Sequence, residues 1–136
     1  MKNKQQLEVV YPAVFTPEIN GGYLIEFPDI QGAFTGINTN DLVMGLKMAE
    51  EVLGMVCADY LENGDKLRAP SAVNQVEHAD AAFVTLVKTD VAKYLKDGPL
   101  VKKTLAIPTW ANQLAQDQQI NFSALLTKAI AQELEH

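Results

Sequence analysis

The first third of the chain alternates between apolar and polar positions in short runs that are separated by turn residues. Residues 7–15 are rich in Val, Tyr and Phe, and residues 23–27 resume the alternation after Asn-Gly-Gly at 20–22. β-branched and aromatic residues with a period of two are typical of strands, and Asn-Gly is a strong turn signal. We therefore predict a β-hairpin, followed by a third short strand over 32–36, where Ala-Phe-Thr follows a bend.

Near residue 40 the apolar positions change to the period of a helix. Thr39 is a candidate N-cap, Asp41 and Leu42 open the pattern, and Glu-Asn-Gly at 62–64 ends it. The sequence thus predicts one long helix that runs to about residue 61. One face of this helix is apolar, as in a helix that lies across a sheet. That face consists of Leu42, Leu46, Ala49, Leu53, Val56, Cys57 and Tyr60.

A second stripe on the same helix is rich in methionine. Met44, Met48, Val52 and Met55 fall in an arc about 80° wide at about 100° per residue. The stripe is either an extension of the core, because methionine fills gaps, or a partner surface, where methionine is also over-used. The sequence leaves both interpretations open.

Residues 65–80 are polar and read as a connection, and Ala-Phe-Val-Thr-Leu-Val at 82–87 predicts a fourth strand. Because its apolar side chains point both ways, we expect this strand in the centre of the sheet. Asp90 is a candidate cap for a short helix through Tyr94, and Asp-Gly-Pro at 97–99 has the composition of a linker. These elements form a ββ(β)αβ domain that ends near residue 98.

The C-terminal segment is built differently. We predict a strand over 100–107, a helix with Pro108 as its first residue, a break at Gln118 and Gln119, and a second helix capped by Asn121. The two helices carry apolar stripes, which are Trp110, Ala111, Leu114 and Ala115, and Phe122, Leu125, Leu126, Ala129 and Ile130. About 35 residues cannot satisfy the strand's backbone groups or bury both stripes alone. The simplest partner is the same strand of a second copy, in an intertwined dimer.

Composition narrows the possible functions. The chain has 136 residues, 48% hydrophobic and 21% charged, which fits a globular protein of one domain plus a small module. Residues 1–99 hold eight basic and fourteen acidic side chains and account for the whole net charge of −6, while 100–136 hold three of each. This balance argues against coating nucleic acid by bulk charge and suits a basic protein partner.

The sequence shows no feature of a secreted or membrane-spanning protein. The one cysteine, Cys57, cannot form an intramolecular disulfide, and no apolar run has the length of a signal peptide or a membrane span. We therefore expect a cytoplasmic protein. Residues 134–136, Leu-Glu-His, resemble the start of an affinity-tag scar, so 135 and 136 are excluded from functional reasoning.

Catalysis has weak support in the sequence. Cys57 lies on the apolar helix face, His78 stands alone in a polar connection, and no glycine-rich phosphate loop is present. Glu26, Asp29 and Asp59 are candidates for a divalent-cation site if they converge, as in a metal-dependent nuclease. Solvated surface carboxylates are the simpler interpretation, and we expect a protein that is not an enzyme and has no cofactor.

The C-terminal strand has a second possible role besides dimerisation. A two-stranded antiparallel ribbon fits the DNA major groove, and its outward side chains reach base edges. With Leu105 and Ile107 facing the core, Lys102, Thr104 and Ala106 face outward, and base reading rests mainly on Lys102 and Thr104. The start of the second helix, with Asn121 and Ser123, offers N–H and hydroxyl groups to a phosphate. These residues alone do not separate DNA binding from dimerisation.

Motifs from both halves resemble one family. Residues 11–15 read Tyr-Pro-Ala-Val-Phe, and 21–32 read Gly-Gly-Tyr-x-Ile-x-Phe-Pro-Asp-Ile-x-Gly before the capped helix. Residues 105–115 read Leu-Ala-Ile-Pro-x-Trp-Ala-Asn-x-Leu-Ala, and 120–126 read Ile-Asn-Phe-Ser-x-Leu-Leu. The first pair resembles the N-terminal domain of the HicB antitoxins of bacterial toxin–antitoxin pairs. The second resembles the ribbon-helix-helix tail of one branch of that family.

The resemblance implies an α+β protein with two parts. Residues 1–98 would form a truncated ribonuclease-H-like βββαβ domain that lacks its catalytic carboxylates and covers HicA, a small basic mRNA-cleaving toxin. Residues 99–134 would form a ribbon-helix-helix (βαα) module that dimerises and binds operator DNA to repress its own operon. The sequence leaves open whether two such dimers pair into a tetramer. The alternatives are the metal-dependent nuclease described above and a stand-alone repressor whose N-terminal domain senses a ligand.

Overall fold

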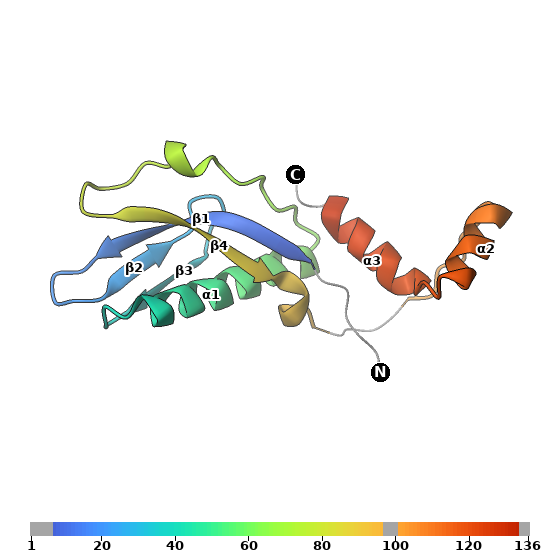
Figure 1. Ribbon diagram of the computed structural model, residues 1–136, viewed down its shortest axis with the longest axis horizontal. Coiled ribbons are helices and arrows are strands. Elements are labelled where there is room, and N and C mark those ends of the chain that lie inside the picture. The colour runs from blue at the N-terminus through green and yellow to red at the C-terminus, as the bar shows by residue number, and fades with distance from the viewer. Residues whose placement is uncertain (1–6, 97–100, 134–136) are drawn as a thin grey trace.

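Two separate stretches of the chain, 7–96 and 101–133, are described by the computed structural model. The first contains a four-stranded antiparallel sheet of order β3-β2-β1-β4 and a long helix (Figure 1). The strands are β1 (Glu8–Pro17), β2 (Tyr23–Glu26), β3 (Phe34–Ile37) and β4 (Phe83–Asp90). The helices are α1 (Leu42–Glu62), the short 3₁₀ helices η1 (Val73–Gln75) and η2 (Val91–Tyr94), α2 (Thr109–Asp117) and α3 (Phe122–Glu133). The expected mixed α+β class is thereby confirmed.

The predicted hairpin is confirmed. β1 and β2 pair antiparallel, with Phe15 opposite Ile25. The turn between them requires glycine, because Gly22 has φ +83° and a Cβ at that position would lie 2.0 Å from the carbonyl oxygen of Ile37. The third strand begins at Phe34, two residues later than predicted, because the bend over 27–33 is closed by its own hydrogen bonds, including Phe27 N–H to the Ala33 carbonyl at 3.1 Å.

The prediction that the fourth strand is central was wrong. β4 lies at one edge of the sheet, and β1 occupies a central position between β4 and β2. β4 has apolar side chains on both faces because α1 covers one face and the connection between α1 and β4 runs along the other (Figure 1). Leu86, on the face opposite α1, remains 53% exposed.

The long helix packs on the sheet through small residues. The side chain of Asp41 caps it by accepting the Val43 N–H at 3.0 Å, so the predicted cap Thr39 is displaced by two residues. Leu42 and Leu46, expected in the core, are each 45% exposed. The buried residues are Gly45, Ala49, Leu53, Gly54, Cys57 and Ala58.

Two glycines explain this change of face. A Cβ at Gly45 would lie 3.1 Å from the ring of Phe15, so the first half of α1 approaches the sheet at this position. In the second half, η2 packs beside the helix, and a Cβ at Gly54 would lie 2.3 Å from the ring of Tyr94. Large side chains therefore cannot form the contact face at these positions, a constraint that apolar periodicity does not reveal.

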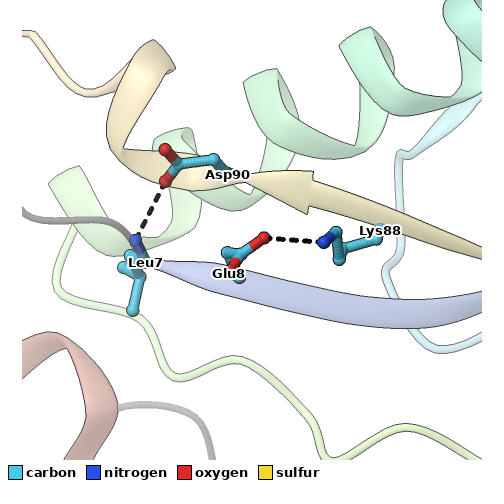
Figure 2. Close-up of polar contacts among 4 residues, drawn as sticks. All are labelled: Leu7, Glu8, Lys88 and Asp90. Atoms are coloured by element: carbon cyan, nitrogen blue, oxygen red, sulfur yellow. Dashed lines mark hydrogen bonds and ion pairs between the residues drawn. The ribbon is translucent and has the colours of Figure 1, made fainter.

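The start of β1 is fixed to the end of β4 (Figure 2). The carboxylate of Asp90 accepts the Leu7 N–H at 2.9 Å and the Ala92 N–H at 3.1 Å, so it also caps η2 as predicted. Glu8 and Lys88 form an exposed ion pair at 2.9 Å, and its hydrogen bond and charge raise the pKa of Lys88. These contacts hold the first residues of β1 against the last residues of β4. The predicted linker at 97–99 lies outside the described residues.

The connection between α1 and β4 is anchored at its first half. Asp29 is buried, and its carboxylate accepts the backbone N–H of Ser71 at 2.8 Å and the Ser71 hydroxyl at 2.6 Å. The Tyr11 hydroxyl donates to the carbonyl of Arg68, and Leu67 is fully buried. A buried carboxylate with two donors is satisfied, so Asp29 holds the connection against the sheet.

Candidate functional site

The predicted DNA-binding strand is not a strand in the single chain. Residues 101–108 form no ladder, and every residue of 101–110 is exposed, including Lys102 and Thr104. The prediction of a strand over 100–107 is therefore corrected for 101–107, while Leu100 lies outside the described residues. The physical reason is that a strand acquires its hydrogen bonds from a neighbouring strand, and the described parts of one chain offer this segment none.

The two C-terminal helices agree closely with expectation. α2 begins at Thr109, directly after Pro108, and the break contains Gln119 in the left-handed region at φ +56°. Asn121 caps α3, because its side-chain oxygen accepts the Ala124 N–H at 3.0 Å. Ser123 is exposed in the first turn of α3. The structure therefore places Asn121 and Ser123 together at a helix N-terminus, and Lys102 and Thr104 on a different segment.

The large apolar side chains of these helices are left uncovered by the other described residues, whereas the small Ala115 of the α2 stripe is buried. The large side chains of the tail are 40–80% exposed, and they are Val101, Leu105, Ile107, Trp110, Leu114, Ile120, Phe122, Leu125, Leu126 and Ile130. In α3 the less exposed residues, Ala124, Lys128 and Ala131, lie on the opposite side of the helix from the stripe. The stripe of α3 is thus turned outward and is available to a partner.

The candidate metal ligands do not converge. Glu26 pairs with Val14 on the sheet face opposite α1, whereas Asp59 is exposed on α1 itself. Asp29 is occupied by Ser71. Within 7–96 and 101–133, no group of three His, Cys, Asp or Glu side chains is arranged to hold a metal ion. The geometry therefore gives no support to the metal-dependent nuclease.

Cys57 and His78 are the two other residues that the sequence offered as candidates for chemistry. Cys57 is fully buried in the core, and His78 is exposed with its Nδ1 2.8 Å from the carbonyl oxygen of Ala79. Tyr94 has its pKa raised by burial and by the nearby carboxylates of Glu50 and Glu51. None of these arrangements joins a nucleophile to a base.

The methionine stripe is not an extension of the core along its length. Met44 is 47% exposed and Met55 is 57% exposed, while Met48 is half-buried. Met44 and Met48 line an open, shallow hollow together with Glu18, Gly36, Ile37 and Asn38. Of the two interpretations left open by the sequence, exposure at Met44 and Met55 favours a partner surface.

Comparison with known proteins identifies the family. No family model matches the chain. Antitoxin HicB 1 of Photorhabdus laumondii subsp. laumondii is 30% identical over 96 residues, which is 71% of this chain and 60% of that protein. A chain of a solved toxin–antitoxin complex from Streptococcus pneumoniae is 32% identical, with 93% of this chain and 99% of that chain covered and a TM-score of 0.58. The chain belongs to the HicB antitoxin family.

Membership of the HicB family confirms the resemblance carried by the motifs at 11–15 and 21–32. The crystal structure of the Burkholderia pseudomallei antitoxin HicB shares the fold at 18% identity and a TM-score of 0.58, with 93% of this chain and 99% of that chain covered. The chain spans 60% of the length of the curated HicB relative. In the described parts of this HicB chain, no helix is long and apolar enough to cross a membrane.

Sequence reasoning missed one feature of this HicB chain, which is the exposed outer edge of β3. β3 was expected as a strand, but its place at the edge depends on pairing order, which local patterns do not encode. A charge signal was nevertheless present, because residues 5–46 contain five acidic side chains and no Lys or Arg.

Proposed function

We propose that the chain is a non-enzymatic antitoxin that binds and neutralises a small, basic, mRNA-cleaving ribonuclease of the HicA type. The observation that carries this proposal is similarity at 32% identity along 99% of a chain from a toxin–antitoxin complex. The acidic excess of residues 1–99 supports it, because opposite charge accelerates and orients the approach of a basic protein.

Co-expression tests this function directly. The small basic protein encoded beside this chain's gene is expressed alone and together with the chain, and growth and copurification are measured. We expect growth arrest with the basic protein alone, and both rescue and a stable complex when the chain is present. Absence of both a complex and rescue would refute the antitoxin function.

We propose a two-part architecture for this role. Residues 1–98 act as a truncated ribonuclease-H-like toxin-binding domain, and residues 99–134 act as a ribbon-helix-helix module. Two observations support the second part: the segment 101–108 lacks a ladder, and the large apolar side chains of α2 and α3 are exposed. A second copy supplies the missing strand and covers the stripes in one step, which makes the module a two-fold dimer.

We propose further that this dimer binds operator DNA and represses its own operon. Lys102 and Thr104 read base edges from the ribbon, and Asn121 and Ser123 place the N-terminus of α3 against a phosphate. The charge of residues 100–136 is balanced at three basic and three acidic side chains, so affinity depends on a few placed contacts and its salt dependence is shallow.

The double substitution Lys102→Ala with Thr104→Ala tests the DNA contact. We expect operator affinity to fall by about thirtyfold or more in gel-shift titrations, because each good base contact is worth about 1–3 kcal/mol. Dimerisation and toxin binding stay at wild-type level, because Lys102 and Thr104 face outward from the proposed ribbon and lie outside the proposed toxin-binding domain of residues 1–98. Unchanged operator affinity would show that the ribbon does not read DNA through these residues.

A further inference from the structure

The outer edge of the sheet at β3 has backbone groups directed away from the sheet. The Phe27 N–H donates to the Ala33 carbonyl at 3.1 Å. In an antiparallel pair every second residue is hydrogen-bonded, so the backbone N–H and C=O groups of residues 33, 35 and 37 point toward β2. The N–H and C=O groups of Phe34 and Gly36 consequently point outward. In the part of the chain that the structure describes, β3 is the last strand on this side of the sheet.

This edge lacks the features that usually protect an edge strand. β3 reads Phe-Thr-Gly-Ile and carries neither a charge nor a proline. The opposite edge strand, β4, carries Lys88, and η1 packs near it. The shortness of β3 limits non-specific pairing, but apolar side chains beside it extend the surface on both faces of the sheet.

The two flanks of the edge are formed by different elements. On the face opposite α1, Phe34 is 62% exposed and Leu24 is 37% exposed. On the α1 side, Ile37, Met44 and Met48 line the shallow hollow. A strand added to β3 alternates its side chains between these two flanks, so backbone hydrogen bonds give affinity and the flanks give specificity.

Charge selects the kind of partner. Glu18 lines the hollow, Glu26 lies directly opposite Phe34, and the first basic residue after Lys4 is Lys47. Edge-to-edge pairing with a second copy would place two surfaces of the same negative sign side by side, which offers no electrostatic attraction. A strand that carries Lys or Arg is attracted electrostatically to this acidic surface, whereas a second copy of the chain is not.

We propose that the outer edge of β3 binds an extended strand of the basic toxin by adding it to the sheet. This inference rests on the proposed antitoxin function and names the surface that performs it. It also gives part of the methionine stripe a role, because exposed Met44 and half-buried Met48 form the apolar flank under the added strand.

Three variants test the edge, with binding to a catalytically inactive form of the adjacent basic protein measured by calorimetry. Gly36→Pro removes an N–H that points away from β2, where an edge strand tolerates proline. Phe34→Ala removes an apolar side chain from the flank opposite α1, and Met48→Ala removes one from the flank on the α1 side. We expect each variant to weaken binding at least about tenfold, as for an apolar anchor near the centre of an interface.

Control substitutions remove exposed apolar side chains that lie outside the two flanks. Leu86→Ala removes an apolar side chain, 53% exposed, from the same sheet face at the opposite edge, and Val43→Ala removes one, 78% exposed, from α1. We expect both to bind within about twofold of wild type. Thermal unfolding of every variant confirms that the sheet is intact, and Phe34→Ala remains informative if Gly36→Pro fails to fold.

The outcomes separate the two proposals. If the wild-type chain does not bind the basic protein, the antitoxin function fails. If it binds and the edge variants bind equally well, only the β3 proposal is overturned. A change of oligomeric state in the edge variants without loss of toxin binding would assign the edge to a second copy and would also overturn the proposal.

Discussion

The contact between Gly54 and Tyr94 offers a direct test of how α1 is positioned. A Cβ at Gly54 would lie 2.3 and 2.4 Å from two carbons of the Tyr94 ring and 2.9 Å from the hydroxyl oxygen of Thr89, which is itself buried. Contacts this short require the ring or the helix to move. We therefore expect Gly54→Ala to destabilise the protein, although alanine is the better helix former.

The magnitude follows from two opposing effects. Overpacking costs about 1–3 kcal/mol, and the overlap with three atoms places this site near the upper value. Alanine in place of glycine inside a helix returns about 1 kcal/mol. The net loss is about 2 kcal/mol, which lowers the melting temperature of a unit this size by about 8–16 °C.

Thermal and urea unfolding of four proteins measure the effect: wild type, Gly54→Ala, Tyr94→Leu and the double variant. In the Tyr94→Leu background the smaller side chain leaves room, so the same substitution becomes neutral or stabilising. Gly36→Ala is the control, because its Cβ meets only the carbonyl oxygen of Tyr23 at 3.6 Å, an ordinary contact. A Gly54→Ala protein as stable as wild type, or an equal loss in both backgrounds, would refute the reasoning.

Three further predictions concern the tail, the connection and alkaline pH. Leu126→Glu should abolish the dimer in analytical ultracentrifugation by placing a charge in the outward stripe of α3, whereas Thr127→Glu beside it leaves the dimer intact; a dimer in both would move the interface elsewhere. Ser71→Ala should cost about 1.5–3 kcal/mol in urea unfolding, because it removes the hydroxyl donated to buried Asp29 at 2.6 Å, while exposed Asn74→Ala changes little. The pKa of Tyr94 is raised above its ordinary 10.0, so the folded state favours the neutral phenol and loses stability as pH rises above 10.0; Tyr94→Phe should flatten this loss, and an unchanged pH profile would contradict it.

Local patterns were sufficient where the determinants are local. The hairpin, the break at Gln119 and the Asn121 cap depend on neighbouring residues, so turn chemistry and capping predicted them. The motifs also led to the HicB family, which the comparison confirms. The candidate DNA-contacting residues Lys102 and Thr104 stay predictions, because the ribbon that would present them requires a second chain.

The tertiary structure decided what depends on distant contacts. Strand order placed β4 at the edge and left the other edge open at β3, and no local pattern records which strands become neighbours. The helix α1 approaches the sheet and η2 so closely that only small side chains fit between them, and its buried face therefore contains glycine and alanine. Leu42, Leu46 and Met44 remain exposed as a result. The sequence alone determined the strands and helices of the N-terminal unit, the two C-terminal helices, the family and the acidity of the first 99 residues. Packing determined which surfaces remain for partners, because that depends on contacts between residues distant in the chain.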